Sequence, residues 1–298
     1  MEYHNPVLLQ QSVDGLEIEP NGIYVDVTFG GGGHSKEILK RLGEGGKLYA
    51  FDQDEEAFQN NLEDDRFVLI KGNFKYIKRF LRIYGVTKVN GILADLGVSS
   101  HQFDVAERGF STRFDALLDM RMDAKTELSA HTIVNHYDES ALQDILFNYG
   151  ELRNARALAK KIVKAREEQP IKTSFELKEV LKDFLPQHRE HKVMAQIFQA
   201  IRIEVNQELE VLKEFLLQTP ELLVEGGKLS VISYHSLEDR LVKRFFKFGL
   251  FEGEPVKDFY GNFSTPFKKP KKLIIPAFEE IKQNSRARSA KLRIVAKA

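Results

Sequence analysis

The chain of 298 residues contains no cysteine, which excludes disulfide bonds, thiolate metal sites and cysteine nucleophiles. It also lacks an apolar run near the roughly 18 residues that a membrane span needs. Because residues 1–6 are polar, we expect no signal peptide there. Positive and negative residues balance at 44 each, so the chain lacks the overall charge of a protein that coats nucleic acid. We therefore expect a cytoplasmic protein without membrane contact, in which charge acts locally.

A strand, a glycine-rich loop and the start of a helix lie near the N-terminus. The apolar run Ile23–Val27 leads into four glycines, Gly30–Gly33, after which Ser35–Leu42 has apolar residues at helical spacing. Glycines permit positive φ angles and close approach of the backbone to a ligand, and a helix start offers free N–H groups. The segment predicts a nucleotide-like cofactor, with a plain surface loop as the alternative.

Residues that this loop lacks narrow the choice of cofactor. A dinucleotide fingerprint that starts at Gly30 requires a third glycine where Ser35 stands, and a phosphate-binding P-loop requires a Gly-Lys-Ser/Thr sequence that is absent. The spacing of Asp26, Gly30 and Gly32 resembles the D-x-x-x-G-x-G loop of S-adenosylmethionine sites, where the carboxylate can face the methionine amine. We therefore expect S-adenosylmethionine rather than a nicotinamide cofactor.

Strands and helices alternate through the first third of the chain. After the first strand, further strands are expected at Lys47–Phe51, Phe67–Lys71 and Gly91–Ala94. This order predicts a parallel, doubly wound sheet that binds ligands at the carboxyl ends of its strands. Asp26, Asp52 and Asp95 all fall at that edge. One such carboxylate could be a helix N-cap, but three favour a cofactor crevice in which Asp52 accepts the ribose hydroxyls.

The alternation stops after residue 104, and residues 105–200 show only helical spacing. We therefore predict an α/β, Rossmann-like methyltransferase domain formed by residues 1–104 and 201–298, with an inserted helical domain at 105–200. The second part is expected to contain the helix Ile203–Leu217 and the strands Leu229–Ser233, Lys272–Ile275 and Leu292–Val295.

Positive charge is concentrated at the end of the chain. Residues 257–298 contain 11 basic and 3 acidic residues, a net charge of +8. The cations alternate with aromatic residues, namely Phe259, Tyr260, Phe263 and Phe267. Cations that follow a phosphate backbone and rings that stack on unpaired bases are typical of RNA-binding surfaces. We expect Lys268, Lys269 and Lys271 to contact RNA; the alternative is a solvated face with the aromatic residues in the core.

Eight sequence strings together resemble one enzyme family. They are VDVTFGGGGHS, FDQD, ADLGVSSHQFD, ERGFS, LDMRMD, FQAIRIEVNQEL, SYHSLEDR and NSRARSAKLR. In this order, and over nearly the whole chain, they are similar to the bacterial methyltransferases that modify N4 of a decoding-centre cytosine in 16S ribosomal RNA. One departure is Ala116-Leu117, where the family has Gly-Pro.

The resemblance implies a fold, a cofactor and a partner. The fold is the methyltransferase fold with a helical insertion, and the partner is small-subunit ribosomal RNA, which we expect in the assembled subunit; a homodimer remains open. The implied S-adenosylmethionine ligands are Gly32, Gly33, His34, Asp52, Phe74, Asp95 and Gln102. A non-catalytic RNA-binding assembly factor and a methyltransferase with another acceptor remain alternatives.

Methylation of a cytosine amine requires a hydrogen-bond acceptor for its hydrogens and alignment with the sulfonium methyl group. We expect Asp95, or the backbone beside it, to be that acceptor, with Ser99 and His235 as further catalytic candidates. The alternative for the SYHSLED segment is a helix N-cap at Ser236.

The helical insertion supplies two further candidates for RNA contact. Arg108 and Arg121 are placed to bind RNA phosphate, and a structural ion pair is the equal alternative. His188 and His191 have H-x-x-H spacing but no third ligand, so we expect no metal.

Overall fold

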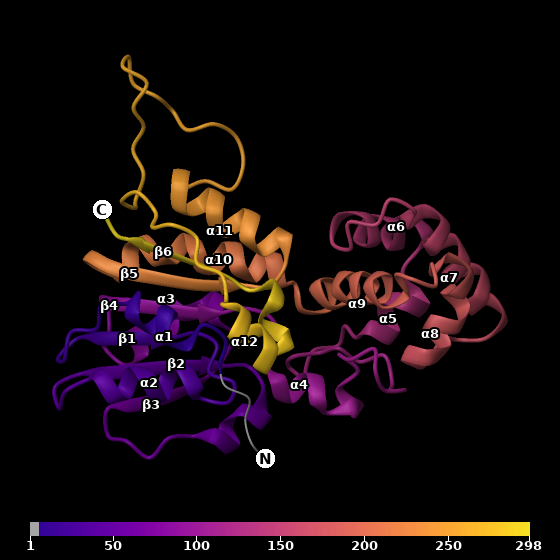
Figure 1. The fold of residues 1–298 in the computed structure, drawn as a ribbon, viewed down its shortest axis with the longest axis horizontal. Coiled ribbons are helices and arrows are strands. Elements are labelled where there is room, and N and C mark those ends of the chain that lie inside the picture. The colour runs from indigo at the N-terminus through magenta and orange to yellow at the C-terminus, as the bar shows by residue number, and fades with distance from the viewer. Residues whose placement is uncertain (1–5) are drawn as a thin grey trace. The chain divides into compact units, whose positions relative to one another are not determined.

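The computed structural model describes residues 6–298. The chain forms two compact units, one made of the segment up to Gly97 together with Leu209–Ala298, and the other made of Val98–Glu208. The first unit holds a six-stranded sheet with the order β3-β2-β1-β4-β5-β6 (Figure 1). The first five strands are parallel and β6 is antiparallel to β5. The strands are β1 Ile23–Asp26, β2 Lys47–Asp52, β3 Phe67–Lys71, β4 Val89–Asp95, β5 Leu223–Ser233 and β6 Lys291–Ala296.

Helices cover both faces of this sheet because side chains along each strand alternate between faces and both sets are apolar. Val25 and Ile92 belong to the core that holds α3, α10 and α11. Tyr24 and Leu93, one position along, belong to the core that holds α1 and α2. The helices of this unit are α1 Leu9–Asp14, α2 Gly33–Arg41, α3 Ile77–Ile83, α10 Glu208–Leu222, α11 Ser236–Phe248 and α12 Phe278–Gln283. The expected α/β Rossmann-like fold is confirmed.

The second unit is helical and has its own apolar core. Its helices are α4 Ser100–Asp104, α5 Ala130–His136, α6 Glu139–Asn148, α7 Ala155–Glu168, α8 Ser174–Leu181 and α9 Glu190–Asn206. The unit extends past the expected limit at residue 200 because α9 buries Ile201 and Val205 in this core. It begins before residue 105 because α4 belongs to it. None of the helices in residues 6–298 is both long and apolar enough to cross a bilayer.

Two expected elements differ in the structure. The helix predicted at Ile203–Leu217 is two helices, because α9 ends at Asn206 and Gln207 takes a left-handed conformation with φ 51°. Apolar spacing continues through this break, so periodicity did not show it. The strand predicted at Lys272–Ile275 is a single bridge between Ile274 and Leu292. The prolines on either side, Pro270 and Pro276, have no N–H to extend the pairing.

A candidate cofactor and methyl-transfer site

The glycine loop joins β1 to α2 and needs glycine for two reasons. Gly30 and Gly32 have positive φ angles of 50° and 73°, which side chains rarely adopt. A Cβ atom on Gly32 would also lie 2.9 Å from the Phe29 ring. The helix α2 then begins at Gly33 with no side chain capping its N-terminus. The N–H groups of its first turn therefore suit a ligand carboxylate.

Asp26, the last residue of β1, stabilises the glycine loop through hydrogen bonds. Its carboxylate is completely buried and accepts hydrogen bonds from Ser35 Oγ at 2.7 Å and from the Thr28 N–H at 3.1 Å. Burial raises the pKa of Asp26. Both oxygens accept hydrogen bonds from the loop, and the expectation that this carboxylate faces a ligand amine stays a prediction.

Asp52 lies at the end of β2, beside the glycine loop. One carboxylate oxygen accepts the Gly30 N–H at 2.8 Å, and the other accepts the Asp54 N–H at 2.9 Å. A carboxylate has about four acceptor positions, so Asp52 retains capacity for two ligand hydroxyls. Burial raises the pKa of Asp52 to about 6.

Asp95 ends β4 and is the centre of a polar cluster. The Tyr234 hydroxyl donates to its Oδ1 at 2.7 Å, and His34 Nδ1 lies 3.8 Å from its Oδ2. The Asp95 N–H donates to Thr28 Oγ1 at 2.7 Å, which ties β4 to the glycine loop. Burial raises the pKa of Asp95 to about 6. This carboxyl group can therefore change protonation state near neutral pH.

His34 and Phe74 frame the same edge of the sheet. Burial lowers the pKa of His34, and its Nε2 lies 3.2 Å from the Val7 carbonyl. A carbonyl oxygen only accepts hydrogen bonds, so Nε2 carries the proton of the neutral ring. Phe74 follows β3 and packs edge-on against Phe215, with ring centroids 5.3 Å apart. The structure thus brings His34, Phe74 and the two aspartates Asp52 and Asp95 to the carboxyl edge of the sheet.

His235 is the N-cap of α11, one position before Ser236, the residue that the N-cap alternative named. Its ring and the Glu238 carboxylate form a capping box. The Glu238 carboxylate also accepts the Tyr234 N–H at 2.8 Å. Histidine is an uncommon N-cap, so the sequence favoured the serine. This geometry supports the capping role of His235, and its catalytic role stays a prediction.

Four further predicted site residues, for catalysis, cofactor binding and RNA contact, lie in the helical unit. Ser99 and Gln102 form the capping box of α4, in which each side chain bonds the backbone N–H of the other. Arg121 makes two hydrogen bonds to the Asp119 carboxylate, at 2.9 and 2.7 Å. Arg108 donates to the Arg121 carbonyl at 3.0 Å. These contacts favour the ion-pair alternative for Arg121, and RNA binding by Arg108 and Arg121 stays a prediction.

The C-terminal cations differ in their partners. Lys268 and Lys269 are exposed, whereas Lys271 donates to Glu17 at 2.7 Å. The nearby aromatic residues also divide: Phe267 is buried in the sheet core, but Phe259 and Tyr260 are almost fully exposed. The core alternative therefore holds for Phe267, and RNA contact by Lys268, Lys269 and Lys271 stays a prediction.

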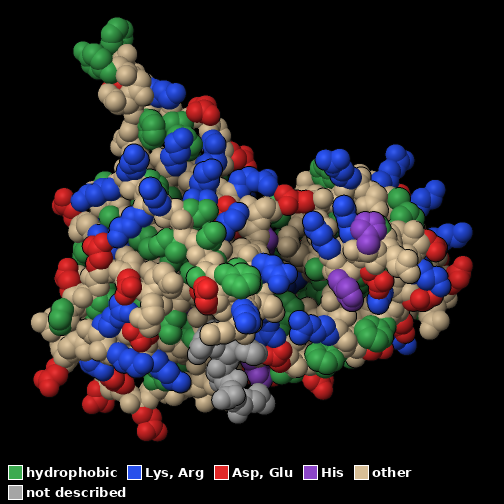
Figure 2. Space-filling model, viewed as in Figure 1, with side chains coloured by type: hydrophobic (Ala, Val, Ile, Leu, Met, Phe, Trp, Pro, Cys, Tyr) green, Lys and Arg blue, Asp and Glu red, His purple; other side chains and the backbone are tan. Residues whose placement is uncertain are grey.

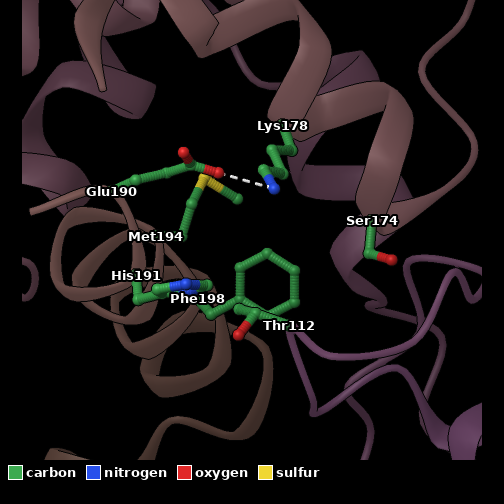
Figure 3. A pocket seen from close by; sticks show the side chains of 7 residues that line it. All are labelled: Thr112, Ser174, Lys178, Glu190, His191, Met194 and Phe198. Carbon is green, nitrogen blue, oxygen red and sulfur yellow. Dashed lines mark ion pairs between the residues drawn. The ribbon is translucent and has the colours of Figure 1, made fainter. Parts of the chain in front are cut away.

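A small hollow in the helical unit is separate from the predicted site. It is lined by Thr112, Ser174, Lys178, Glu190, His191, Met194 and Phe198 (Figure 3). Lys178 Nζ and Glu190 Oε1 are 2.5 Å apart across it. The cation and the carboxylate neutralise each other, so the hollow offers no charge of its own to a ligand.

Sequence reasoning missed three partners of the central carboxylates. Thr28 and Ser35 donate hydrogen bonds to the Asp26 carboxylate. Thr28 Oγ1 also accepts the Asp95 N–H at the end of β4, and the Tyr234 hydroxyl donates to the Asp95 carboxylate. Thr28 and Ser35 lie within the glycine segment, where hydroxyl side chains next to a buried acid were a usable signal. Tyr234 is 139 positions from Asp95, and only the pairing of β4 with β5 brings them together.

Comparisons with known proteins identify the family of this chain. All 298 residues match the MraW methylase family. The chain is 68% identical to ribosomal RNA small subunit methyltransferase H of Flavobacterium johnsoniae, with 100% of this chain and 98% of that protein covered. It is 55% identical to the protein of the same name in Bacteroides fragilis, with 99% and 97% covered. A solved putative rRNA methylase from Clostridium thermocellum is a weaker match, with TM-score 0.45, 15% identity and 98% of each chain covered. The full-length match and the high identity place this chain in the MraW methylase family.

Proposed function

We propose that this protein transfers a methyl group from S-adenosylmethionine to N4 of a decoding-centre cytosine in 16S ribosomal RNA. The observation that carries the proposal is the convergence of the glycine loop, Asp52 and Asp95 at one sheet edge in a chain that matches the MraW methylase family over its full length. The curated relatives are named as small-subunit ribosomal RNA methyltransferases.

The residues at this edge fit S-adenosylmethionine. The uncapped N-terminus of α2 suits the methionine carboxylate, and Asp52 has acceptor capacity for the ribose hydroxyls. Phe74 offers an apolar ring surface for the adenine. When bound, the cofactor supplies an electrophilic methyl group on a sulfonium centre.

Asp95 is the residue best placed to handle the cytosine amine. The amine is conjugated with the ring and weakly nucleophilic, so an acceptor that draws on its hydrogens increases electron density on N4. With the cofactor bound, its methyl carbon would pass from sulfur to N4, and the proton that N4 loses would go to Asp95. Tyr234 fixes one oxygen of Asp95 through a hydrogen bond of 2.7 Å. The carboxyl pKa of about 6 allows Asp95 to hold the released proton transiently.

We propose that the substrate is the assembled small subunit, that the protein acts in the cytoplasm where ribosomes are made, and that it can form a homodimer. Equal methylation rates on naked 16S RNA and on isolated subunits would contradict the first point. Sedimentation velocity tests the homodimer directly, because a purely monomeric species over the working concentration range rules it out.

Two alternatives predict different results in one labelling experiment. A non-catalytic assembly factor would bind RNA but transfer no labelled methyl group, and a methyltransferase with another acceptor would label DNA or a small molecule instead.

Nicotinamide cofactors should not bind. Saturable NAD binding at micromolar concentration would contradict the choice of S-adenosylmethionine over a nicotinamide cofactor.

The affinity for S-adenosylmethionine is expected to fall as pH is lowered from about 8 to about 5. Burial raises the pKa of Asp52 to about 6, and ligand hydroxyls donate to its ionised form. Binding therefore releases a proton on the acid side of this pKa and is favoured at higher pH. Calorimetry over this pH range measures the effect. In Asp52→Ala the dependence should shrink to the part that Asp95 contributes, and an unchanged profile would contradict the role of Asp52.

Removal of positive charge at Lys268 and Lys269 is expected to weaken RNA binding and flatten its salt dependence. Each cation that contacts single-stranded phosphate contributes about 0.7 to the slope of log affinity against log salt, so Lys268→Gln/Lys269→Gln should reduce the slope by about 1.4. Lys271 is left intact because it pairs with Glu17. Cofactor affinity is the control and should not change. An identical salt slope would assign these lysines to an ordinary solvated face.

A further inference from the structure

Residues 255–266 form a hairpin that projects from the end of α11 in the first unit (Figure 1). Lys257 and Phe263 pair across it as an antiparallel bridge. At the turn, the Asp258 N–H donates to the Asn262 carbonyl at 2.7 Å, and Gly261 has a φ of 84°. The Asp258 carboxylate accepts the Tyr260 and Asn262 N–H groups at 2.9 and 2.8 Å. The turn is therefore held by hydrogen bonds to the backbone and to the Asp258 carboxylate.

The base of the hairpin is fixed to the protein by aromatic packing. The Phe263 ring lies 5.4 Å from the Phe248 ring of α11. Phe267 is 1% exposed and packs on Phe245 and Phe246, at 5.8 Å from each ring. The hairpin is thus held firmly at its base.

Within residues 6–298, the two aromatic residues at the turn make ring contact only with each other. Phe259 is 96% exposed and Tyr260 is 85% exposed, and their ring centroids are 5.6 Å apart at an interplanar angle of 89°. Figure 2 shows hydrophobic side chains gathered at the end of this projection. Because the turn is held by other contacts, these rings are not needed to fold it. Large rings left in water on a built turn indicate a contact with another molecule.

Cations surround the lower part of the hairpin. Lys257 lies on the hairpin itself, Lys268 and Lys269 follow it, and Lys243 and Lys247 are exposed on α11. Figure 2 shows Lys and Arg side chains gathered over this region, below the apolar tip. Glu252 and Glu254 are the acidic residues on the approach to the hairpin, and Asp258 is engaged in the turn. The surface therefore combines stacking rings with a positive surround.

This combination fits unpaired nucleotides better than a protein surface. Single-stranded nucleic acid is bound by rings that stack on bases together with cations that follow the phosphates. A docking protein or a second copy of the chain would require a continuous apolar area, whereas the tip offers two rings and Val256, which is 93% exposed.

We propose that Phe259 and Tyr260 stack on unpaired bases of the small-subunit RNA at a point other than the target cytosine. The hairpin is then a second attachment that positions the RNA while the sheet edge carries out the chemistry. This inference rests on the proposed function, because it takes ribosomal RNA as the partner.

The first test is the double variant Phe259→Ala/Tyr260→Ala. Its affinity for 16S RNA should fall at least tenfold, which corresponds to about 1.4 kcal/mol, while the salt slope stays the same because no phosphate contact is lost. The conservative pair Phe259→Tyr/Tyr260→Phe should keep the affinity. Val256→Ala, which removes exposed apolar surface from the same hairpin without removing a ring, is the matched control and should also keep it.

A spectroscopic test uses the absence of tryptophan from the chain. Tyr260→Trp introduces a single indole at the tip, and stacking on a base should quench its emission when 16S RNA binds. The quenching should saturate with the same dissociation constant as RNA binding. Bound RNA with unchanged emission would overturn the proposal.

The outcomes separate this inference from the proposed function. If the wild-type protein methylates 16S RNA but the double alanine variant binds it with unchanged affinity, only the hairpin proposal fails. If the loss appears with assembled subunits and not with naked RNA, or if Val256→Ala matches the double variant, the tip contacts protein and the proposal is also wrong. If the wild-type protein transfers no methyl group to RNA in either form, the proposed function fails.

Discussion

Asp52→Ala is expected to weaken S-adenosylmethionine binding by at least about 100-fold. The substitution removes the acceptor for two ribose hydroxyls, and each charge-assisted hydrogen bond contributes about 1.5 to 3 kcal/mol. It also leaves the N–H groups of Gly30 and Asp54 without their acceptor, which loosens the glycine loop in the same direction. Calorimetric titration of the folded variant measures the loss.

The control for this change is Asp65→Ala. Asp65 is an exposed carboxylate in the same half of the chain, so its loss alters the net charge equally without touching the sheet edge. Affinity should stay within about twofold in the control. An unchanged affinity in folded Asp52→Ala would remove the second-strand carboxylate from the cofactor site.

Asp95→Asn is expected to slow methyl transfer at least about tenfold when cofactor and RNA are both saturating. Asparagine keeps the size of the side chain and one oxygen for the Tyr234 hydroxyl, but it is a weaker acceptor for the cytosine amine. The rate change corresponds to roughly 1.4 kcal/mol of lost transition-state stabilisation.

Single-turnover kinetics separate this chemical effect from binding. A variant impaired only in cofactor affinity recovers the full rate once both substrates saturate. Full recovery in Asp95→Asn would leave Asp95 as a cofactor ligand and transfer the acceptor role to Ser99 or His235. Tyr234→Phe is the companion variant: it keeps the ring but removes the donor to Asp95, so it should slow the same step by a smaller factor.

The parts of the fold that sequence predicted are those with local signals. The glycine loop, the strands before Asp52 and Asp95 and the helical insertion each follow from a pattern within a short window. The break at Gln207 was hidden because apolar spacing runs through it, and only the left-handed backbone shows it. Tertiary contacts were beyond the reach of such patterns.

In the site, too, sequence predicted what local patterns show and not what tertiary contacts decide. The strand-end positions of Asp52 and Asp95 were predictable, but the contact between Tyr234 and Asp95 depends on which strands are neighbours. The aromatic residues of the basic tail looked alike in sequence. Phe267 packs in the core and Phe259 projects into solvent because the turn built on Asp258 lies between two segments anchored to α11, one by Phe251 on Phe245 and the other by Phe267 on Phe246.

The central claim is tested most directly by mapping the methylated base. The protein is incubated with labelled S-adenosylmethionine and either naked 16S RNA or isolated small subunits, and the modified nucleotide is located by mass spectrometry. The account predicts one labelled methyl group on N4 of a decoding-centre cytosine, with faster labelling of the assembled subunit and labelling at least about tenfold slower in Asp95→Asn. Label on another base or another class of molecule, or the absence of any label, would contradict it.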